Sequence, residues 1–139
     1  MGFVKYMEVE RRNPGDDDFS IDHPSLEQIL NAISSLDGKV STYVMLFPND
    51  EDPTEAYLAI GGGNDGRFLV NHWDGVNEVE QRVIDPSVTS DEYVDVMMVQ
   101  LTERKAPEIV DLATALKVAT AYDATGELTT EVTWKRDSR

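Results

Sequence analysis

The sequence predicts an α+β protein, in which a mainly antiparallel sheet of five to seven strands carries two helices packed on one face. Three observations predict this class. Most β-type segments follow one another directly, separated by short turn-rich or acidic stretches. Only two segments have helical periodicity, one near each end of the chain. The 139 residues, 40% of them apolar, suit a single domain over 1–139 with a substantial core.

The first two segments, "FVKYMEVE" and "RRNPGDDD", predict a strand followed by a loop. In the strand, Met7 and Val9 face one side while Glu8 and Glu10 face the other. The next segment contains a Pro-Gly pair, which favours a turn, and three adjacent aspartates, which do not suit a regular buried element.

A helix is predicted over residues 24–36, with a proline at its first position and Asp22 or His23 as its cap. Ser25 and Gln28 have the spacing of a capping box, in which each side chain bonds the other residue's backbone. A glycine follows the last periodic position and ends the helix. One apolar face is formed by Leu26, Ile29, Leu30, Ile33 and Leu36.

Four β-rich segments follow: "STYVMLF", "EAYLAIG", "GRFLVNHW" and "VNEVEQRVI". The acidic loop "PNDEDPTE" separates the first two. In the fourth segment, either Val79 and Val83 or Val76 and Ile84 face the core. Their order predicts a meander of neighbouring antiparallel strands.

The glycine-rich stretch "GGGNDG", residues 61–66, predicts a hairpin and not an anion-binding loop. A phosphate-binding glycine loop leads into a helix, whose N-terminus faces the phosphate. Here the following residues, 68–70, are typical of a strand, and no lysine follows the glycines. Asn64, Asp65 and Gly66 tolerate the positive φ angles of a tight turn.

The C-terminal part predicts a strand, a helix and a last strand. "YVDVMMVQL" is interpreted as a strand, with a buried helical turn as the alternative. The helix is predicted over 107–122, opened by Pro107 and capped by Gly126. "ELTTEVTW" alternates as a half-buried strand does, and Trp134 is more typical of a core residue than of a ligand platform.

The net charge of −15 is unevenly distributed along the chain. Residues 13–95 hold 18 of the 27 acidic residues but only Lys39, Arg67 and Arg82 as bases. A surface of this sign repels nucleic acid and anionic lipid and attracts basic partners. Solubility, or adaptation of a whole proteome to salt, explains acidity equally well, but the clustering favours a partner.

The residues offer little material for catalysis. Nucleophilic catalysis needs a base beside the nucleophile, and only His23 and His72 are available. There is no cysteine, and the acidic loops lack the pattern of a calcium loop. We therefore expect no catalytic residue, metal or cofactor. The alternative is a hydrolase or small-ligand-binding protein that uses His72 and nearby carboxylates such as Asp74. Without a secretory or membrane-spanning segment, we expect a cytoplasmic protein.

The succession "HPSLEQILNAISSLDG", "YLAIGGGNDGRFLVNHW", a helix running to "ATGEL" and a tryptophan in "VTW" resembles the first-numbered family of bacterial immunity proteins. The similarity covers about residues 23–134. It implies an α+β, non-catalytic protein that neutralises a polymorphic toxin, often a nucleic-acid deaminase. Such a toxin has a basic cleft for phosphates, which an acidic inhibitor can block. The family pattern assigns no toxin-contacting positions.

We predict that the partner binds the acidic, loop-rich half of the chain. In a simple meander, the turn before the hairpin and the turn after it emerge at the same end of the sheet, opposite the Asn64 tip. Their charges would add there, with aromatic side chains at the desolvated centre. Two alternatives stay open: these acids are solvated loop residues, or the protein is an acidic mimic of nucleic acid or an adaptor. The predicted partner-binding residues are Asp50, Glu51, Asp52, Tyr57, Trp73, Asp74, Glu78 and Glu80.

Overall fold

The computed structural model describes residues 2–11, 19–48, 56–97 and 101–138. The α-helices are α1 (Leu26–Ser34) and α2 (Leu112–Thr125), and two short 3-10 helices are η1 (Asn64–Gly66) and η2 (Ala106–Glu108). The strands are β1 (Tyr6–Arg11), β2 (Phe19–Asp22), β3 (Ser41–Phe47), β4 (Ala56–Gly62), β5 (Phe68–Asp74), β6 (Val79–Ile84), β7 (Tyr93–Met97), β8 (Leu101–Lys105) and β9 (Thr133–Ser138).

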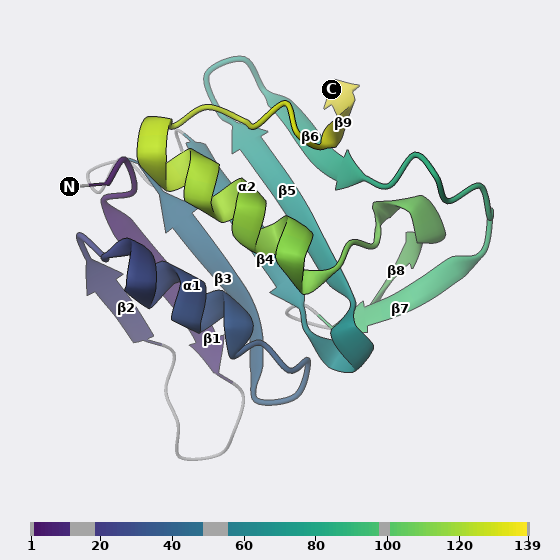
Figure 1. Cartoon of the computed structure of the whole chain (residues 1–139), viewed down its shortest axis with the longest axis horizontal. Helices are drawn as coiled ribbons and strands as arrows, with labels where there is room; N and C mark the ends of the chain where they lie inside the picture. Colours follow the sequence, from purple (N-terminus) through teal and green to yellow (C-terminus); the bar gives the residue numbers. More distant parts are fainter. Residues whose placement is uncertain (1, 12–18, 49–55, 98–100, 139) are drawn as a thin grey trace.

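Seven strands form one antiparallel sheet in the order β2-β1-β3-β4-β5-β6-β9. A second antiparallel sheet contains β7 and β8, and β7 packs against β4. Both α-helices cover the same face of the large sheet, where they also contact each other (Figure 1). The predicted α+β class, the strand number and the placement of the helices are confirmed.

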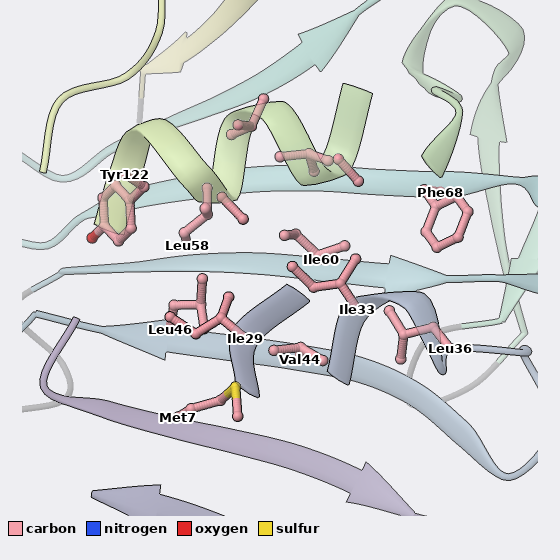
Figure 2. Packing of buried hydrophobic residues seen from close by; sticks show 14 of the residues in the cluster. Met7, Ile29, Ile33, Leu36, Val44, Leu46, Leu58, Ile60, Phe68 and Tyr122 are labelled. Atoms are coloured by element: carbon pink, nitrogen blue, oxygen red, sulfur yellow. The ribbon is translucent and has the colours of Figure 1, made fainter. Parts of the chain in front are cut away.

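The main core lies between the helices and the sheet (Figure 2). Alternate residues of the central strands point into it, because side chains of a strand alternate between its faces. Small side chains at Ala115 and Ala119 let α2 lie close to the sheet, and both are fully buried. The other fully buried members include Met7, Ile29, Ile33, Val44, Leu46, Leu58 and Ile60.

Helix α1 spans Leu26–Ser34, inside the predicted range 24–36: Pro24 precedes the N-cap and is not the first helical residue, and the helix ends at the C-cap Ser35, before the predicted end at Gly38. Ser25 is the N-cap: its hydroxyl accepts from the backbone N–H of Gln28 at 3.1 Å, and the Gln28 side chain accepts from the Ser25 N–H at 2.9 Å. The capping box is confirmed, but the expected cap at Asp22 or His23 is wrong. His23 instead has φ of 51° and turns the chain between β2 and the helix.

The glycine-rich stretch is the hairpin between β4 and β5, as predicted. Gly63 has φ of 99°, and a Cβ placed on it would lie 2.2 Å from the carbonyl oxygen of Leu36. The residue must therefore be glycine both for its conformation and for its contact with the loop after α1. This hairpin supports the α1–β3 connection and does not run into an α-helix.

Helix α2 begins at Leu112, so the predicted start at Pro107 is wrong. Residues 106–110 are held by the sheets: the Val110 N–H donates to the Phe68 carbonyl at 2.9 Å, and the Asp85 N–H donates to the Pro107 carbonyl at 2.7 Å. Asp111 then caps the helix, its carboxylate accepting from the Thr114 N–H at 2.8 Å. Long-range hydrogen bonds override the proline signal here.

Three further differences concern strands. The segment 93–101 is a strand only to Met97, and Leu101–Lys105 forms an unpredicted partner strand; residues 98–100 lie outside the described residues. The short β2 was not predicted. Residues 127–132 are irregular, with a turn at 130–131, and the last strand is Thr133–Ser138, because it pairs along β6. In β6, Val79 and Val83 are the buried pair.

Candidate partner-binding surface

Three of the predicted binding residues lie side by side on the large sheet. Tyr57 of β4 is opposite Trp73 of β5, which is opposite Glu80 of β6. Their strand neighbours Leu58 and Val70 belong to the core beneath the helices. Because side chains alternate along a strand, Tyr57, Trp73 and Glu80 lie on the face away from the helices.

Two further rings extend this line across the sheet. Phe47 of β3 lies 6.1 Å from Tyr57 between ring centroids, and Tyr6 of β1 lies 5.7 Å from Phe47. Phe47 is buried, whereas the other three rings are half-buried. We call Tyr6, Phe47, Tyr57 and Trp73 the aromatic row. Alternation in "FVKYMEVE" and "STYVMLF" signals that Tyr6 and Phe47 lie opposite the core residues Met7 and Leu46, but only the strand order joins them to Trp73.

The predicted carboxylates have different surroundings. Asp74 ends β5 and folds back on the following turn: its oxygens accept from the N–H groups of Val76 and Asn77 and from the Asn77 side chain. These hydrogen bonds lower the pKa of Asp74, that from the Asn77 side chain contributing most. Glu78 is exposed in the same turn, with φ of 54°. Glu80 is paired with Arg82 at 2.9 Å.

Asp50, Glu51 and Asp52 lie outside the described residues, so their position stays a prediction. The flanking geometry is known: Ala56, the first residue of β4, is opposite Asp74, the last residue of β5. The beginning of β4 and the β5–β6 turn therefore share one end of the sheet, and the hairpin tip at η1 lies at the other.

His72 lies on the helix-covered side of β5. Its ring meets that of Tyr122 in α2 edge to face, with centroids 5.7 Å apart. Its Nδ1 is buried and has no hydrogen-bond partner within the described part of the chain. Burial lowers the pKa of His72, and the charge of Asp74 only partly offsets this effect. The hydrogen bonds of Asp74 go to its own turn, and none joins it to the His72 ring within the described residues.

No cluster of three or more histidine, aspartate or glutamate side chains that could hold a metal occurs among the described residues. In that same part of the chain, neither α-helix has the length and hydropathy of a membrane span. The aromatic row lies beside Glu80 on one face of the sheet, and aromatic residues of this kind are frequent at the centre of protein interfaces.

The chain is similar in sequence to a known protein family. The family model described as "Immunity protein Imm1" matches residues 20–136. The chain belongs to the Imm1 immunity protein family. The resemblance inferred from the glycine-rich hairpin and the C-terminal tryptophan is thereby confirmed, and membership implies a toxin-immunity role with a cognate toxin as partner. No curated protein and no solved structure matches the chain significantly.

Proposed function

We propose that this Imm1 protein binds a cognate polymorphic toxin that acts on nucleic acid, and neutralises it in the cytoplasm by covering its active-site cleft. It does so without catalysis of its own. The observation that supports this proposal is the match to the immunity family over residues 20–136. The aromatic row, with acidic segments at its end of the sheet, is the surface we assign to the toxin.

Charge supports this choice of partner. An enzyme that binds nucleic acid needs positive charge in its cleft to hold phosphates. The chain has a net charge of −15, and it would be steered toward such a cleft and would repel the substrate that competes for it. Charges at the rim of an interface mainly raise the association rate, so affinity needs a desolvated centre.

Tyr57 and Trp73 are suited to form that centre. Aromatic side chains combine a large apolar area with few rotatable bonds, and they dominate the binding energy of many interfaces. The two residues are cross-strand neighbours on β4 and β5, and Phe47 packs against Tyr57. The sheet therefore holds the rings in place before binding. A preordered surface loses less conformational entropy when it binds.

The function is tested by capture and neutralisation. The tagged chain is used to retain proteins from the native cell lysate, and a captured candidate's catalytic domain is then expressed in a bacterial host with and without the chain. We expect the domain alone to stop growth and to modify nucleic acid in vitro, and the chain to abolish both effects. A captured protein whose activity is unchanged by a stoichiometric excess of the chain would disprove the proposal.

The binding surface is tested with Trp73→Ala. We expect its affinity for the toxin to fall by about 30-fold or more, the effect typical of a central aromatic residue. Tyr93→Ala is the matched control: Tyr93 is 62% exposed on β7, away from the aromatic row, and its loss should leave affinity nearly unchanged. Equal toxin affinities of the two variants would show that the aromatic row is not part of the interface.

The acidic-mimic alternative makes a different prediction. A mimic of nucleic acid binds many basic proteins, whereas an immunity protein discriminates its toxin from relatives through specific contacts. Binding to a non-cognate toxin domain of similar positive charge separates the two, because only the mimic would bind it with comparable affinity.

A further inference from the structure

A pocket of about 500 Å³ opens between the N-terminal segment, the start of α1 and the end of α2. These three parts are distant in sequence but adjacent in the fold (Figure 1). Gly2 and Val4 line it from the first, His23 and Leu26 from the second, and Asp123 and Ala124 from the third. We call it the N-terminal pocket. Neither the aromatic row nor His72 contributes to it.

Asp123 gives this pocket its charge. The residue is only 6% exposed, and one carboxylate oxygen accepts from the Val4 N–H at 3.2 Å. The backbone at Gly2 crosses directly over the carboxylate, since a Cβ there would lie 2.0 Å from the Asp123 Oδ1. Within the described part of the chain, no lysine, arginine or histidine nitrogen lies within 4.0 Å of it. The nearby Lys5 instead donates to the Gly2 carbonyl at 3.4 Å.

Within the described part of the chain, one neutral donor, the Val4 N–H, contacts this buried carboxylate, and a single neutral donor compensates only partly for the loss of water. Its place in the helix strengthens this effect, because Asp123 lies in the last turn of α2, where the helix dipole is negative and no basic residue is present. Both contributions favour a positive charge in the pocket. The structure leaves space for one beside the carboxylate.

The walls of the pocket suit the apolar stem of a long basic side chain. Leu26, which lines the pocket, is 36% exposed, and Val4, Pro24 and Ala124 supply further apolar atoms to its lining. Arginine and lysine commonly bury their methylene groups against such surfaces while their charged ends meet a carboxylate.

We propose that the N-terminal pocket receives the charged end of an arginine or lysine side chain of the protein partner, with Asp123 as its acceptor. This inference rests on the proposed function, because it makes the pocket a second contact for the basic toxin. The N-terminal pocket lies at the end of the sheet where the aromatic row crosses it. Tyr6 of that row pairs with Phe47 and with Asp22, and Asp22 directly precedes the lining residue His23.

The pocket itself is tested without the toxin. We titrate the ¹⁵N-labelled chain with N-acetyl-arginine amide and, as a neutral isostere, N-acetyl-citrulline amide. We expect saturable shifts of the backbone amides of Val4, Leu26 and Ala124 with the arginine compound, and at least tenfold weaker binding of the citrulline compound. Absence of saturation, or equal binding of the two compounds, would overturn the proposal.

Asp123→Asn keeps an oxygen that can accept from Val4 but removes the charge. We expect at least tenfold weaker binding of the arginine compound. Ala124→Leu is the second variant, since this exposed residue lines the pocket and a larger side chain there narrows it while leaving Asp123 in place. Glu127→Gln is the control, an exposed carboxylate that does not line the pocket. A folded Asp123→Asn or Ala124→Leu variant that binds as the native chain does would contradict the proposal.

The same variants separate this inference from the proposed function. If a toxin is captured and neutralised, Asp123→Asn should weaken its binding at least tenfold, and unchanged toxin affinity would exclude the pocket from the interface. If no toxin is neutralised, the proposed function fails, whereas the arginine titration still reports whether the pocket binds a basic side chain.

Discussion

At the scale of single residues, His72 links the packing of α2 to pH. Its imidazole is packed against Tyr122 from α2, lies opposite Leu58 of β4 and Gln81 of β6, and is near Asp74 on its own strand. Burial disfavours the charged imidazole, so its pKa in the folded chain lies below the ordinary value of 6.5. As the pH falls below about 6.5, the unfolded chain takes up this proton first, and the folded state loses stability.

We therefore predict that the free energy of unfolding decreases between pH 7.5 and pH 5.5, and that His72→Gln flattens this dependence. Urea unfolding at the two pH values measures the effect. His23→Asn is the control, because His23 is exposed and asparagine tolerates its φ of 51°. A pH dependence that persists in His72→Gln and disappears in His23→Asn would contradict this prediction and show that His23 causes the effect.

Gly63 and Gly66 allow the energetic cost of a close contact to be separated from the cost of a positive φ angle. Both have positive φ, of 99° and 71°, but only Gly63 approaches the Leu36 carbonyl, and nothing lies within 4 Å of a Cβ placed on Gly66. We predict that Gly63→Ala lowers the free energy of unfolding by about 3 kcal/mol or more. Gly66→Ala should lower it by about 1 kcal/mol, the conformational term alone. Chemical denaturation that gives equal losses would show that the contact at Gly63 is easily relieved.

At the scale of elements, a charged contact joins η2 to the large sheet. Arg82 of β6 donates to the Glu108 carboxylate at 2.6 Å, and the Glu108 side chain is 8% exposed. The other oxygen of Glu108 accepts from the Lys105 N–H at 3.3 Å. The contact therefore holds the end of β8 and the path toward α2 against β6. A carboxylate buried in this way is sensitive to the loss of its charge partner.

We predict that Glu108→Gln lowers the free energy of unfolding by about 2 kcal/mol, because the ion pair with Arg82 becomes a hydrogen bond to a neutral acceptor and the amide has one oxygen for the two donors. Asp65→Asn provides the control. Asp65 and Arg67 are 3.9 Å apart with side chains 79% and 43% exposed, and an exposed pair of this kind contributes about 0.5 kcal/mol or less. Thermal unfolding of both variants is the measurement, and comparable losses would contradict the structural role assigned to Glu108.

At the scale of the whole molecule, we propose that the position of the acidic residues affects recognition of the toxin more than their number does. Asp50, Glu51 and Asp52 precede β4, whose first residue lies beside the β5–β6 turn. Asp91, Glu92 and Asp95 lie before and within β7, where the Asn64 side chain donates to the Asp95 carbonyl at 3.5 Å. The two triplets contain the same charge, so their reversal separates local from global electrostatics.

We predict that changing Asp50, Glu51 and Asp52 to lysine slows association with the toxin by about tenfold at low ionic strength and flattens its salt dependence. The same change at Asp91, Glu92 and Asp95 alters the net charge equally and should slow association much less. Stopped-flow rates at low and high salt provide the test. If both triplets have equal effects, only the net charge steers the encounter; if neither has any, the acidic end is not the recognition surface.

Those parts of the fold with local signals were predictable from the sequence. The first helix follows from its apolar period and the Ser25–Gln28 box, and the β4–β5 hairpin from its glycines and its Asn-Asp-Gly tip. A hairpin also sets its own register, so the meeting of Tyr57 with Trp73 depends only on neighbouring residues. The acidity, the scarcity of histidine and the absence of cysteine indicated a binding protein without reference to any contact.

Only the tertiary structure decided the features that depend on distant partners. Pro107 opens only the short 3-10 helix η2 and not α2, because residues 106–110 hydrogen-bond to β5 and to the chain after β6. The last strand shifted to Thr133–Ser138 because β6 supplies its ladder. The aromatic row needs the order β1-β3-β4-β5, and the N-terminal pocket needs Gly2 to meet Asp123. Hydrogen bonds and burial across long sequence separations override local propensity, and no short window of sequence contains them.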